Sequence, residues 1–434
     1  MKEQKIEDIT KPRDIAILAG LNSPRLSDAD NADEETMDEL EALVETAGGQ
    51  TAASVLQNRA APDPRTFIGE GKVAELKELV KNETATTVIF DNDLSPSQLR
   101  VLTGELGVQV LDRSALILDI FAQRARTREG RLQVELAQYQ YLLPRLTGMW
   151  THLERQAGTS GKGPIGSKGP GETQLETDRR HIHRKIDKLK DELEEVRRVR
   201  STQRQRRMKN EIPVVAIVGY TNAGKSTLLN ALTGADIPAN NRLFDTLDTT
   251  SRLLTVSDTL DVVISDTVGF IRKLPHHLVE AFKATLEELE YADLLLHVID
   301  ASNPDWPAQA AVVDQLIHEL GAEQIPRLEV FNKCDRSFGD ILPHGEDRVS
   351  ISAKTGEGLP QLLQAIGKRL DSGAKRVNIH LPYSEGGALE RLYLEAKVEK
   401  VDYSETIDVV AVCTPRTIGQ LKAYVEGWQP PAEF

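Results

Sequence analysis

The hydrophobic pattern of the first quarter of the chain predicts a small α/β domain. Four apolar runs, IAILAGL, AASVLQNRA, TTVIFDND and VQVLDRS, have the length and composition of strands. Helical spacing lies between them, in the acidic stretch Glu34–Ala47, in TFIGEGKVAELKELVKN and in the Ser-capped SPSQLRVLTGEL. Strands that alternate with helices indicate an α/β domain over residues 13–115, after a short N-terminus (1–12) that we expect to be disordered.

The pattern then changes to that of two long helices. Apolar side chains recur at 4-3-4-3 spacing in two sets: Leu132, Leu136, Tyr139, Leu143 and Leu146, and then Ile182, Ile186, Leu189, Leu193 and Val196. This spacing is typical of coiled-coil seams, so residues 116–210 are expected to form an antiparallel helical hairpin. Pro144 should kink or end the first helix near its C-terminal turn.

The connection between these helices is rich in glycine and proline. Its centre, GTSGKGPIGSKGPGE, forms an expected tip over residues 157–171 and cannot bury a core. Lys162, Lys168 and backbone N–H groups at the end of a stiff rod suit contact with phosphates, and a loop without a task is the competing interpretation. The basic run Arg197–Lys209 also has two interpretations: it contacts RNA, or it is the solvated end of a helix.

The second half of the chain predicts two more domains. Buried strands such as IPVVAIV, DTLDVVISD and LLLHVIDAS alternate with helical segments over residues 211–372. After that, VNIHLPY, EGGALERLYLEA, KVEKVDY and TIDVVAVCT predict a small α+β domain over residues 373–434. This last domain carries no recognisable chemistry.

Composition indicates where in the cell the protein is located and which partners it can bind. The 434 residues are 40% hydrophobic and 28% charged, which is ordinary for a globular protein, and no apolar run is long enough to span a bilayer. Without a signal-peptide core, and with Cys334 and Cys413 as the only cysteines, we expect a cytoplasmic protein with no integral membrane segment; peripheral membrane association stays open. The net charge of −14 is segregated: residues 1–50 are acidic, whereas Arg197–Lys209 holds seven basic residues and no acidic one. We expect no DNA partner, although a polyanion could meet the basic run.

The strongest chemical signal is a P-loop. The motif G-x-x-x-x-G-K-[ST] lies between a predicted strand and a predicted helix, and its glycines let the backbone wrap a triphosphate. Lys225 is expected to reach the β- and γ-phosphates, and the Ser226 hydroxyl to bind Mg²⁺. The predicted phosphate-binding residues are Gly219, Tyr220, Thr221, Asn222, Ala223, Gly224, Lys225, Ser226 and Thr227.

Two further segments are predicted to sense the γ-phosphate. Asp266-Thr-Val-Gly269 ends a strand, so Asp266 can hold Mg²⁺ through water and the Gly269 N–H can meet the γ-phosphate. NNRLFDTLDTTSRLL is the expected switch I, with Thr250 as the Mg²⁺-binding threonine and Thr246 and Thr249 as competitors. Mg²⁺ would then have the ligands Ser226, Thr250 and Asp266. The groups assigned to catalysis are Lys225, Thr250 and Gly269.

Guanine specificity is predicted from N-K-x-D. Asp335 can accept hydrogen bonds from the guanine N1–H and exocyclic amine, which adenine does not offer, while Asn332 and Lys333 brace the pocket. VSISAKTGEGL then places Ser352, Ala353 and Lys354 over the base. The nucleotide is therefore expected to be GTP or GDP. The predicted fold class is α/β: a P-loop GTPase domain preceded by a small α/β domain and an antiparallel coiled-coil hairpin, and followed by a small α+β domain.

Hydrolysis by the isolated protein is predicted to be slow. Phe270 stands where Ras-like proteins place a glutamine after D-x-x-G, and phenylalanine cannot orient water. Ile271–His277 follows as switch II, and its histidines are interpreted as surface residues. Gly69 and Gly71, in GEGK, lack P-loop spacing and predict a turn before a helix, with a nucleotide or RNA contact as the alternative.

Longer phrases of the sequence resemble the HflX family of GTPases. The similarity runs from about residue 13 to 370 and is carried by GPGETQLETDRR, TFIGEGKVAELKEL, VIFDNDLSPSQLR and DTVGFIRKLPHHLVEAFKATLEE together with the GTPase motifs. The resemblance implies a GTP-dependent factor that binds the large (50S) ribosomal subunit and its rRNA and splits stalled 70S ribosomes under stress. It also implies ATP use through the N-terminal domain. The family's usual F-A-T-L-D-P-T is here Phe244-Asp-Thr-Leu-Asp-Thr-Thr250, which adds a charge and removes a proline.

Two other functions stay open at this point. One is an NTP-driven RNA remodeller that also uses ATP at its N-terminal domain. The other is a GTP switch whose hairpin docks a protein, for which binding should be insensitive to salt and to neutralising Arg197–Lys209.

Overall fold

The computed structural model describes residues 14–27, 30–149, 170–209, 212–235, 243–244, 250–274, 278, 289–336, 343, 345–370, 373 and 375–426. The predicted disordered N-terminus, most of the glycine-rich tip, Thr246, Thr249, His276 and His277 lie outside these residues. Contacts divide the chain into two compact units. The first comprises residues 1–195, 240–248 and 269–284, and the second comprises 196–239, 249–268 and 285–434. Two short segments from the second half of the sequence thus belong to the unit that the first half builds.

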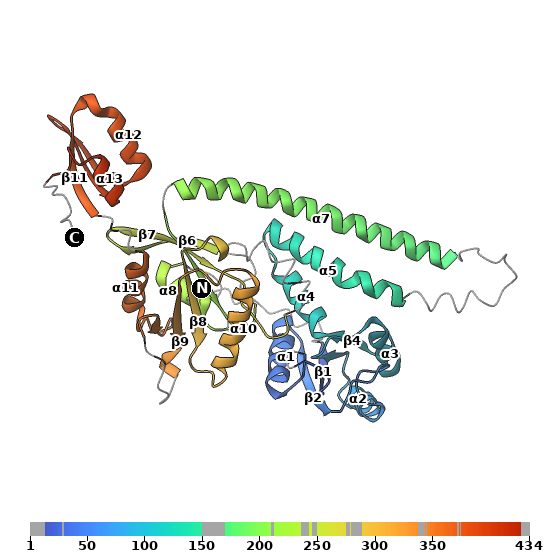
Figure 1. The fold of residues 1–434 in the computed structure, drawn as a ribbon. Helices are drawn as coiled ribbons and strands as arrows, with labels where there is room; N and C mark the ends of the chain where they lie inside the picture. The colour runs from blue at the N-terminus through green and yellow to red at the C-terminus, as the bar shows by residue number, and fades with distance from the viewer. Residues whose placement is uncertain are drawn as a thin grey trace, which may run out of the picture. The chain divides into compact units, whose positions relative to one another are not determined.

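The first unit contains a four-stranded parallel sheet in the order β2-β1-β3-β4 (Figure 1). Its strands are β1 (Ile15–Asn22), β2 (Gln50–Asn58), β3 (Thr87–Phe90) and β4 (Gln109–Asp112). The helices around it are α1 (Glu34–Ala47), α2 (Glu70–Asn82), α3 (Pro96–Leu106) and α4 (Arg113–Arg124). The strands bury apolar side chains against α2 and α3, among them Ile17, Leu76, Val88, Phe90 and Leu102. The predicted order of strands and helices is confirmed here.

Helix starts in this domain follow local chemistry. Ser95 caps α3 as predicted: its side chain accepts a hydrogen bond from the Gln98 N–H, and the Ser95 N–H donates in turn to Gln98 Oε1. Gly69 precedes α2, and its N–H donates to Gln57 Oε1 at 2.9 Å. Helix α4 begins directly after β4, because Asp112 at the end of the strand accepts from the Ala115 N–H. The domain end expected at residue 115 therefore falls inside a helix.

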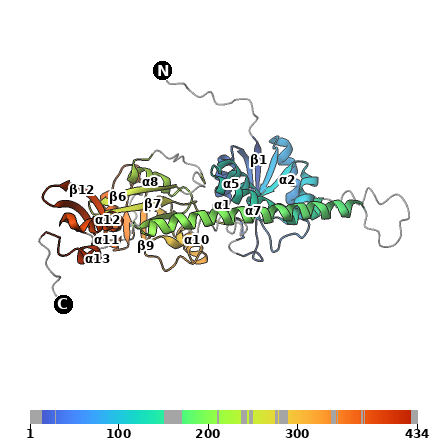
Figure 2. The ribbon, with the colours of Figure 1, turned by 90° about the horizontal axis from the view of Figure 1, so that it is seen from above.

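Helices α5 (Arg128–Met149) and α7 (Pro170–Lys209) lie side by side in both ribbon views (Figures 1 and 2). They run antiparallel, since Arg128 pairs with Glu192 at 3.3 Å while Glu135, further along α5, pairs with Lys185 at 3.9 Å. The predicted hairpin is confirmed. Its seam buries Leu132, Leu136, Ile186, Leu189 and Leu193.

Two details of α5 concern Pro144 and the C-terminal half of the helix. The helix does not end at Pro144 but continues to Met149. Its C-terminal half is fixed to the sheet: Tyr141 Oη donates to Asp112 Oδ1 at 2.8 Å, and Arg145 donates to Asp112 Oδ2 at 2.9 Å and to the Leu94 carbonyl at 3.3 Å. Asp112, which is completely buried, thus joins the strand, α4 and the hairpin.

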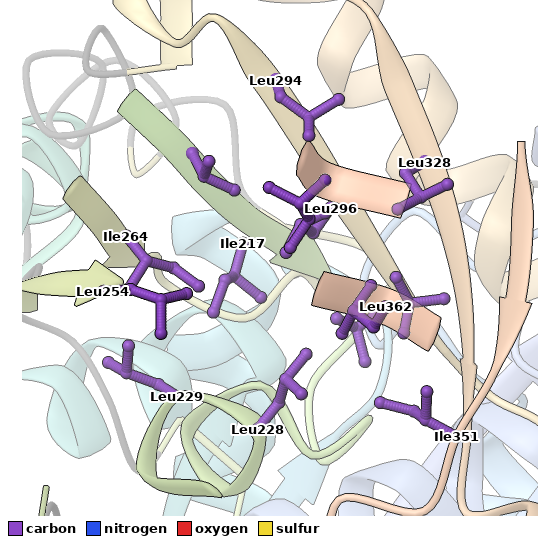
Figure 3. Packing of buried hydrophobic residues seen from close by; sticks show 14 of the residues in the cluster. Ile217, Leu228, Leu229, Leu254, Ile264, Leu294, Leu296, Leu328, Ile351 and Leu362 are labelled. Carbon is purple, nitrogen blue, oxygen red and sulfur yellow. The ribbon is translucent and has the colours of Figure 1, made fainter. Parts of the chain in front are cut away.

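The second unit contains a six-stranded sheet in the order β10-β9-β8-β5-β7-β6, in which only β6 runs antiparallel to its neighbour. The strands are β5 (Val214–Gly219), β6 (Thr250–Ser257), β7 (Leu260–Asp266), β8 (Leu294–Asp300), β9 (Arg327–Asn332) and β10 (Arg348–Ser350). The helices are α8 (Lys225–Thr233), α10 (Trp306–Glu319) and α11 (Leu359–Leu370), with short 3₁₀ turns η1 (Leu289–Tyr291) and η2 (Cys334–Arg336). Side chains from α8, α11 and the sheet interlock in one apolar core (Figure 3).

A three-stranded antiparallel sheet forms the C-terminal part of this unit, in the order β11-β13-β12. It comprises β11 (Lys375–Leu381), η3 (Tyr383–Glu385), α12 (Gly386–Glu395), β12 (Lys397–Tyr403), β13 (Ile407–Cys413) and α13 (Pro415–Gln420). The fold class predicted from the sequence is confirmed in all its parts. Among the described residues, every helix is too short or too polar to pass through a lipid bilayer.

Candidate nucleotide-binding site

The loop after β5 has the backbone of a phosphate-binding turn. Gly219 has φ 155° and Gly224 has φ 92°, and Asn222 between them is left-handed at φ 60°. A Cβ at Gly219 would stand 2.3 Å from the Val298 carbonyl oxygen, and one at Gly224 would stand 2.3 Å from Asn332 Nδ2. Both positions therefore require glycine. Gly224 is also the N-cap of α8 and provides no side-chain cap, so the helix presents its first N–H groups to this loop.

Lys225 is a buried cation in this loop. Its ammonium donates to the carbonyl oxygens of Gly219 at 3.1 Å and Tyr220 at 2.8 Å. Burial lowers the pKa of Lys225 to about 8, although the Asp266 carboxylate acts in the opposite direction. A cation held in so little water is stabilised by an anion at the same place. The left-handed glycine loop and the buried ammonium together fit a phosphate group.

The residues assigned to Mg²⁺ come together beside the P-loop. Ser226 Oγ donates to Asp266 Oδ2 at 2.7 Å, and Asp266 is completely buried at the end of β7. Thr250 opens β6 and lies opposite Asp266 in the strand register. Hydroxyl and carboxylate oxygens are the donors that Mg²⁺ prefers. The donor set therefore fits a hard divalent cation.

Asn332 connects the P-loop to the segments that are predicted to bind guanine. Its Nδ2 donates to the Ala223 carbonyl at 2.8 Å, and its Oδ1 accepts from the Ala353 N–H at 2.9 Å. Lys333 is left-handed, at φ 64°, and its ammonium donates to Asp300 Oδ2 at 2.7 Å. One buried amide thus holds the phosphate loop and the Ser352–Lys354 loop in register.

Asp335 lies in η2 with its carboxylate exposed. A hydrogen bond with the Ser352 side chain keeps the pKa of Asp335 below its ordinary value, so the carboxylate is ionised and accepts hydrogen bonds at neutral pH. Ser352 itself is completely buried and is followed by a turn in which the Thr355 N–H donates to Ser352 Oγ. This arrangement can recognise the N1–H and amine edge of guanine.

Gly269 and Phe270 belong to the first unit, whereas Asp266 belongs to the second. Phe270 is only 1% exposed. Its aromatic ring is therefore buried.

Some residues of the site were not identified from the sequence. Asp300, at the end of β8, is the partner of Lys333. Thr267 donates its hydroxyl to the Ile217 carbonyl at 2.7 Å and ties the D-x-x-G segment to the P-loop strand. Their positions in the sequence could have indicated both residues. Asp300 ends a buried strand and Thr267 directly follows one, at the same edge of the sheet as the motifs.

Comparison with known proteins defines the class. Residues 34–122 match the family model described as "GTP-binding GTPase N-terminal", residues 124–207 match "GTP-binding GTPase Middle Region", and residues 214–333 match "50S ribosome-binding GTPase". With the P-loop and the guanine-binding segments described above, the chain is a GTPase that binds GTP and GDP and hydrolyses GTP to GDP and phosphate.

Two relatives that match most of the chain define the family. GTPase HflX of Caldanaerobacter subterraneus subsp. tengcongensis is 47% identical over 423 residues, which are 97% of this chain and 96% of the relative. GTPase HflX of Escherichia coli is 48% identical over 374 residues, 85% of this chain and 87% of the relative. A crystal structure of a GTP-binding protein from Sulfolobus solfataricus in complex with GDP is 26% identical, with a TM-score of 0.44, and the match covers 82% of this chain and 99% of that one. The chain belongs to the HflX family of GTPases.

Proposed function

We propose that the protein is a ribosome-associated GTPase that binds the large (50S) subunit and its rRNA and splits or rescues stalled 70S ribosomes under stress. The observation that carries this proposal is the match of residues 214–333 to 50S ribosome-binding GTPases, inside a chain that is similar to HflX proteins over nearly its whole length. The stiff α5–α7 hairpin and the basic run Arg197–Lys209 are suited to contact with rRNA.

The nucleotide roles follow from the site. Lys225 and the N–H groups of Gly219–Thr227 would hold the phosphates, Asp335 would accept the guanine edge, and Ser352–Lys354 would cover the base. Mg²⁺, when bound, would neutralise charge on the β- and γ-phosphates, with Ser226, Thr250 and Asp266 as the residues that hold it. The Gly269 N–H would meet the γ-phosphate.

We propose a separate role for each domain of the chain. Residues 13–115 and the hairpin of residues 116–210, with a glycine-rich tip at 157–171, would contact the ribosome. Residues 211–372 would bind and hydrolyse GTP, and residues 373–434 would form a separate small domain. Because Phe270 cannot orient water, ribosomes should stimulate hydrolysis.

Steady-state GTP hydrolysis by the full chain, with and without 50S subunits or 70S ribosomes, tests this function. We expect strong stimulation that Lys225→Ala abolishes, and conversion of 70S particles to subunits in sedimentation profiles. GTP binding without stimulation would contradict the ribosomal function and favour a GTP switch for a protein partner. RNA unwinding that needs ATP, and that is lost on removing residues 1–115 while hydrolysis of GTP persists, would favour an RNA remodeller.

A further inference from the structure

The segment after D-x-x-G lies on the N-terminal domain within the first unit. The ammonium of Lys273 is bonded to Asp91 Oδ2, and Arg272 Nη1 is bonded to Glu35. The Arg272 carbonyl accepts from Arg113 Nη2 at 3.3 Å. Three polar contacts thus fix residues that directly follow a predicted γ-phosphate sensor.

Asp91 is the centre of this contact. Its side chain is completely buried at the end of β3, and each of its oxygens has its own cation: Oδ1 accepts from Arg113 at 2.7 Å, and Oδ2 accepts from Lys273. Arg113 is itself 1% exposed and also donates to Glu39 and to the Thr36 carbonyl. We call Asp91, Arg113, Glu39 and Lys273 the switch clamp.

The buried carboxylate of Asp91 makes Lys273 an integral part of the switch clamp. Arg113 occupies one of its oxygens, and Lys273, a residue 182 positions further along the chain, occupies the other. Withdrawal of Lys273 would leave the second oxygen of a completely buried carboxylate without this cation, which is unfavourable unless water or another cation replaces it.

Switch I contacts the same unit. The Leu243 N–H donates to Thr46 Oγ1 at 3.2 Å, and the Phe244 ring packs edge-on against Phe121 with centroids 4.7 Å apart. Phe244 is 2% exposed. Phe244 and Lys273 are both left-handed, at φ 54° and φ 56°, a conformation that non-glycine residues keep only where their surroundings hold it.

The place of Lys273 in the chain connects this docking to the nucleotide. Gly269, whose N–H is predicted to meet the γ-phosphate, lies in the same segment of the first unit, residues 269–284. Lys273 follows Gly269 by only a few residues, so a segment drawn to the γ-phosphate cannot keep all its contacts with the N-terminal domain.

We propose that Asp91 is a state-specific receptor for Lys273, through which the N-terminal domain binds switch II in the GDP-like state and releases it when GTP binds. This inference needs GTP binding but no ribosome. Because linkage is reciprocal, loss of the clamp raises the affinity for GTP relative to GDP.

The test uses the purified full chain and measures the dissociation constants of fluorescent GDP and of a fluorescent non-hydrolysable GTP analogue. We expect Lys273→Met to shift the ratio of the two constants about tenfold toward the GTP analogue. Asp91→Asn should do the same, and the double variant should add little, because both changes remove one interaction. Lys273→Arg keeps the cation and should restore most of the wild-type ratio. Lys81→Met, on the exposed face of α2, is the matched control and should leave it unchanged.

Hydrogen exchange of residues 34–47 and 87–93 gives a second readout that does not depend on any variant. We expect these peptides to be more protected with GDP than with the GTP analogue. Equal protection in both states, an unchanged affinity ratio in Lys273→Met, or a shift toward GDP would overturn the proposal. Failure of ribosome stimulation would leave it unaffected, so the two proposals are tested separately.

Discussion

Both α/β domains place a glycine directly before a helix, but only one of these glycines builds a ligand site. Gly69 has an ordinary backbone, with φ −69°, its N–H is bonded to Gln57, and a Cβ there would meet only that flexible side chain, at 3.2 Å. Gly219 and Gly224 are left-handed and lie against the Val298 carbonyl and Asn332. What distinguishes the predicted phosphate loop is thus a left-handed backbone packed closely against its neighbours, and not glycine content.

The largest effect is expected from Gly224→Ala, compared with the same substitution at Gly69. Gly224→Ala forces a left-handed alanine and displaces Asn332, which holds two loops. Strain of about 1–3 kcal/mol plus the lost hydrogen bonds should weaken GDP binding by about 1000-fold. Gly69→Ala should change the affinity for GDP less than about twofold. Titration with fluorescent GDP measures the affinity of both variants, and thermal melts confirm that they fold. Similar losses of affinity in the two variants would contradict the distinction between the loops.

A smaller loss is expected from Asp335→Asn. The amide can accept from guanine at one atom only and presents N–H donors to the base, so GTP affinity should fall by about 100-fold while binding of ATP stays weak. The same change should favour a purine with a carbonyl in place of the exocyclic amine, such as xanthine. Competition titrations with GTP, ATP and XTP check this. An unchanged order of preference would remove Asp335 from base recognition. Asp38→Asn, at an exposed position of α1, is the control for a change of the same type.

The smallest effect concerns pH. Because burial lowers the pKa of Lys225 to about 8, this ammonium loses its proton in the free protein at a pH where an ordinary lysine keeps it. A bound phosphate raises that pKa, so binding takes up a proton and GDP affinity should fall about fivefold from pH 8 to pH 9. In the free protein the same shift makes folding stability rise with pH above about 8, since the unfolded chain binds more protons there. Lys225→Arg stays charged and should give a flatter profile; equal slopes in both proteins would assign the effect elsewhere.

Sequence alone predicted the fold class and the GTPase activity, while the roles of the single site residues stay predictions. P-loop and N-K-x-D motifs are local turns after buried strands, so their spacing determines their geometry. Asp300 and Thr267 were missed because they act through single hydrogen bonds to those motifs. The switch clamp could not be predicted, since no pattern of residues near Asp91 or Arg113 indicates a cation from a distant segment. Of the two outcomes predicted for Pro144, a kink or an end of the helix, the structure excludes the end, because α5 continues to Met149.

The position of Asp112 has a mechanical consequence. It fastens the hairpin through Tyr141 and Arg145, near the C-terminal end of α5, and not only at Arg128 where the helix begins. These points are separated by roughly 25 Å along the helix. A rod that is fixed near the end on which a force acts bends less than a rod that is fixed only at its far end. A force on the C-terminal end of α5 would therefore reach the sheet of the N-terminal domain with little bending of the helix.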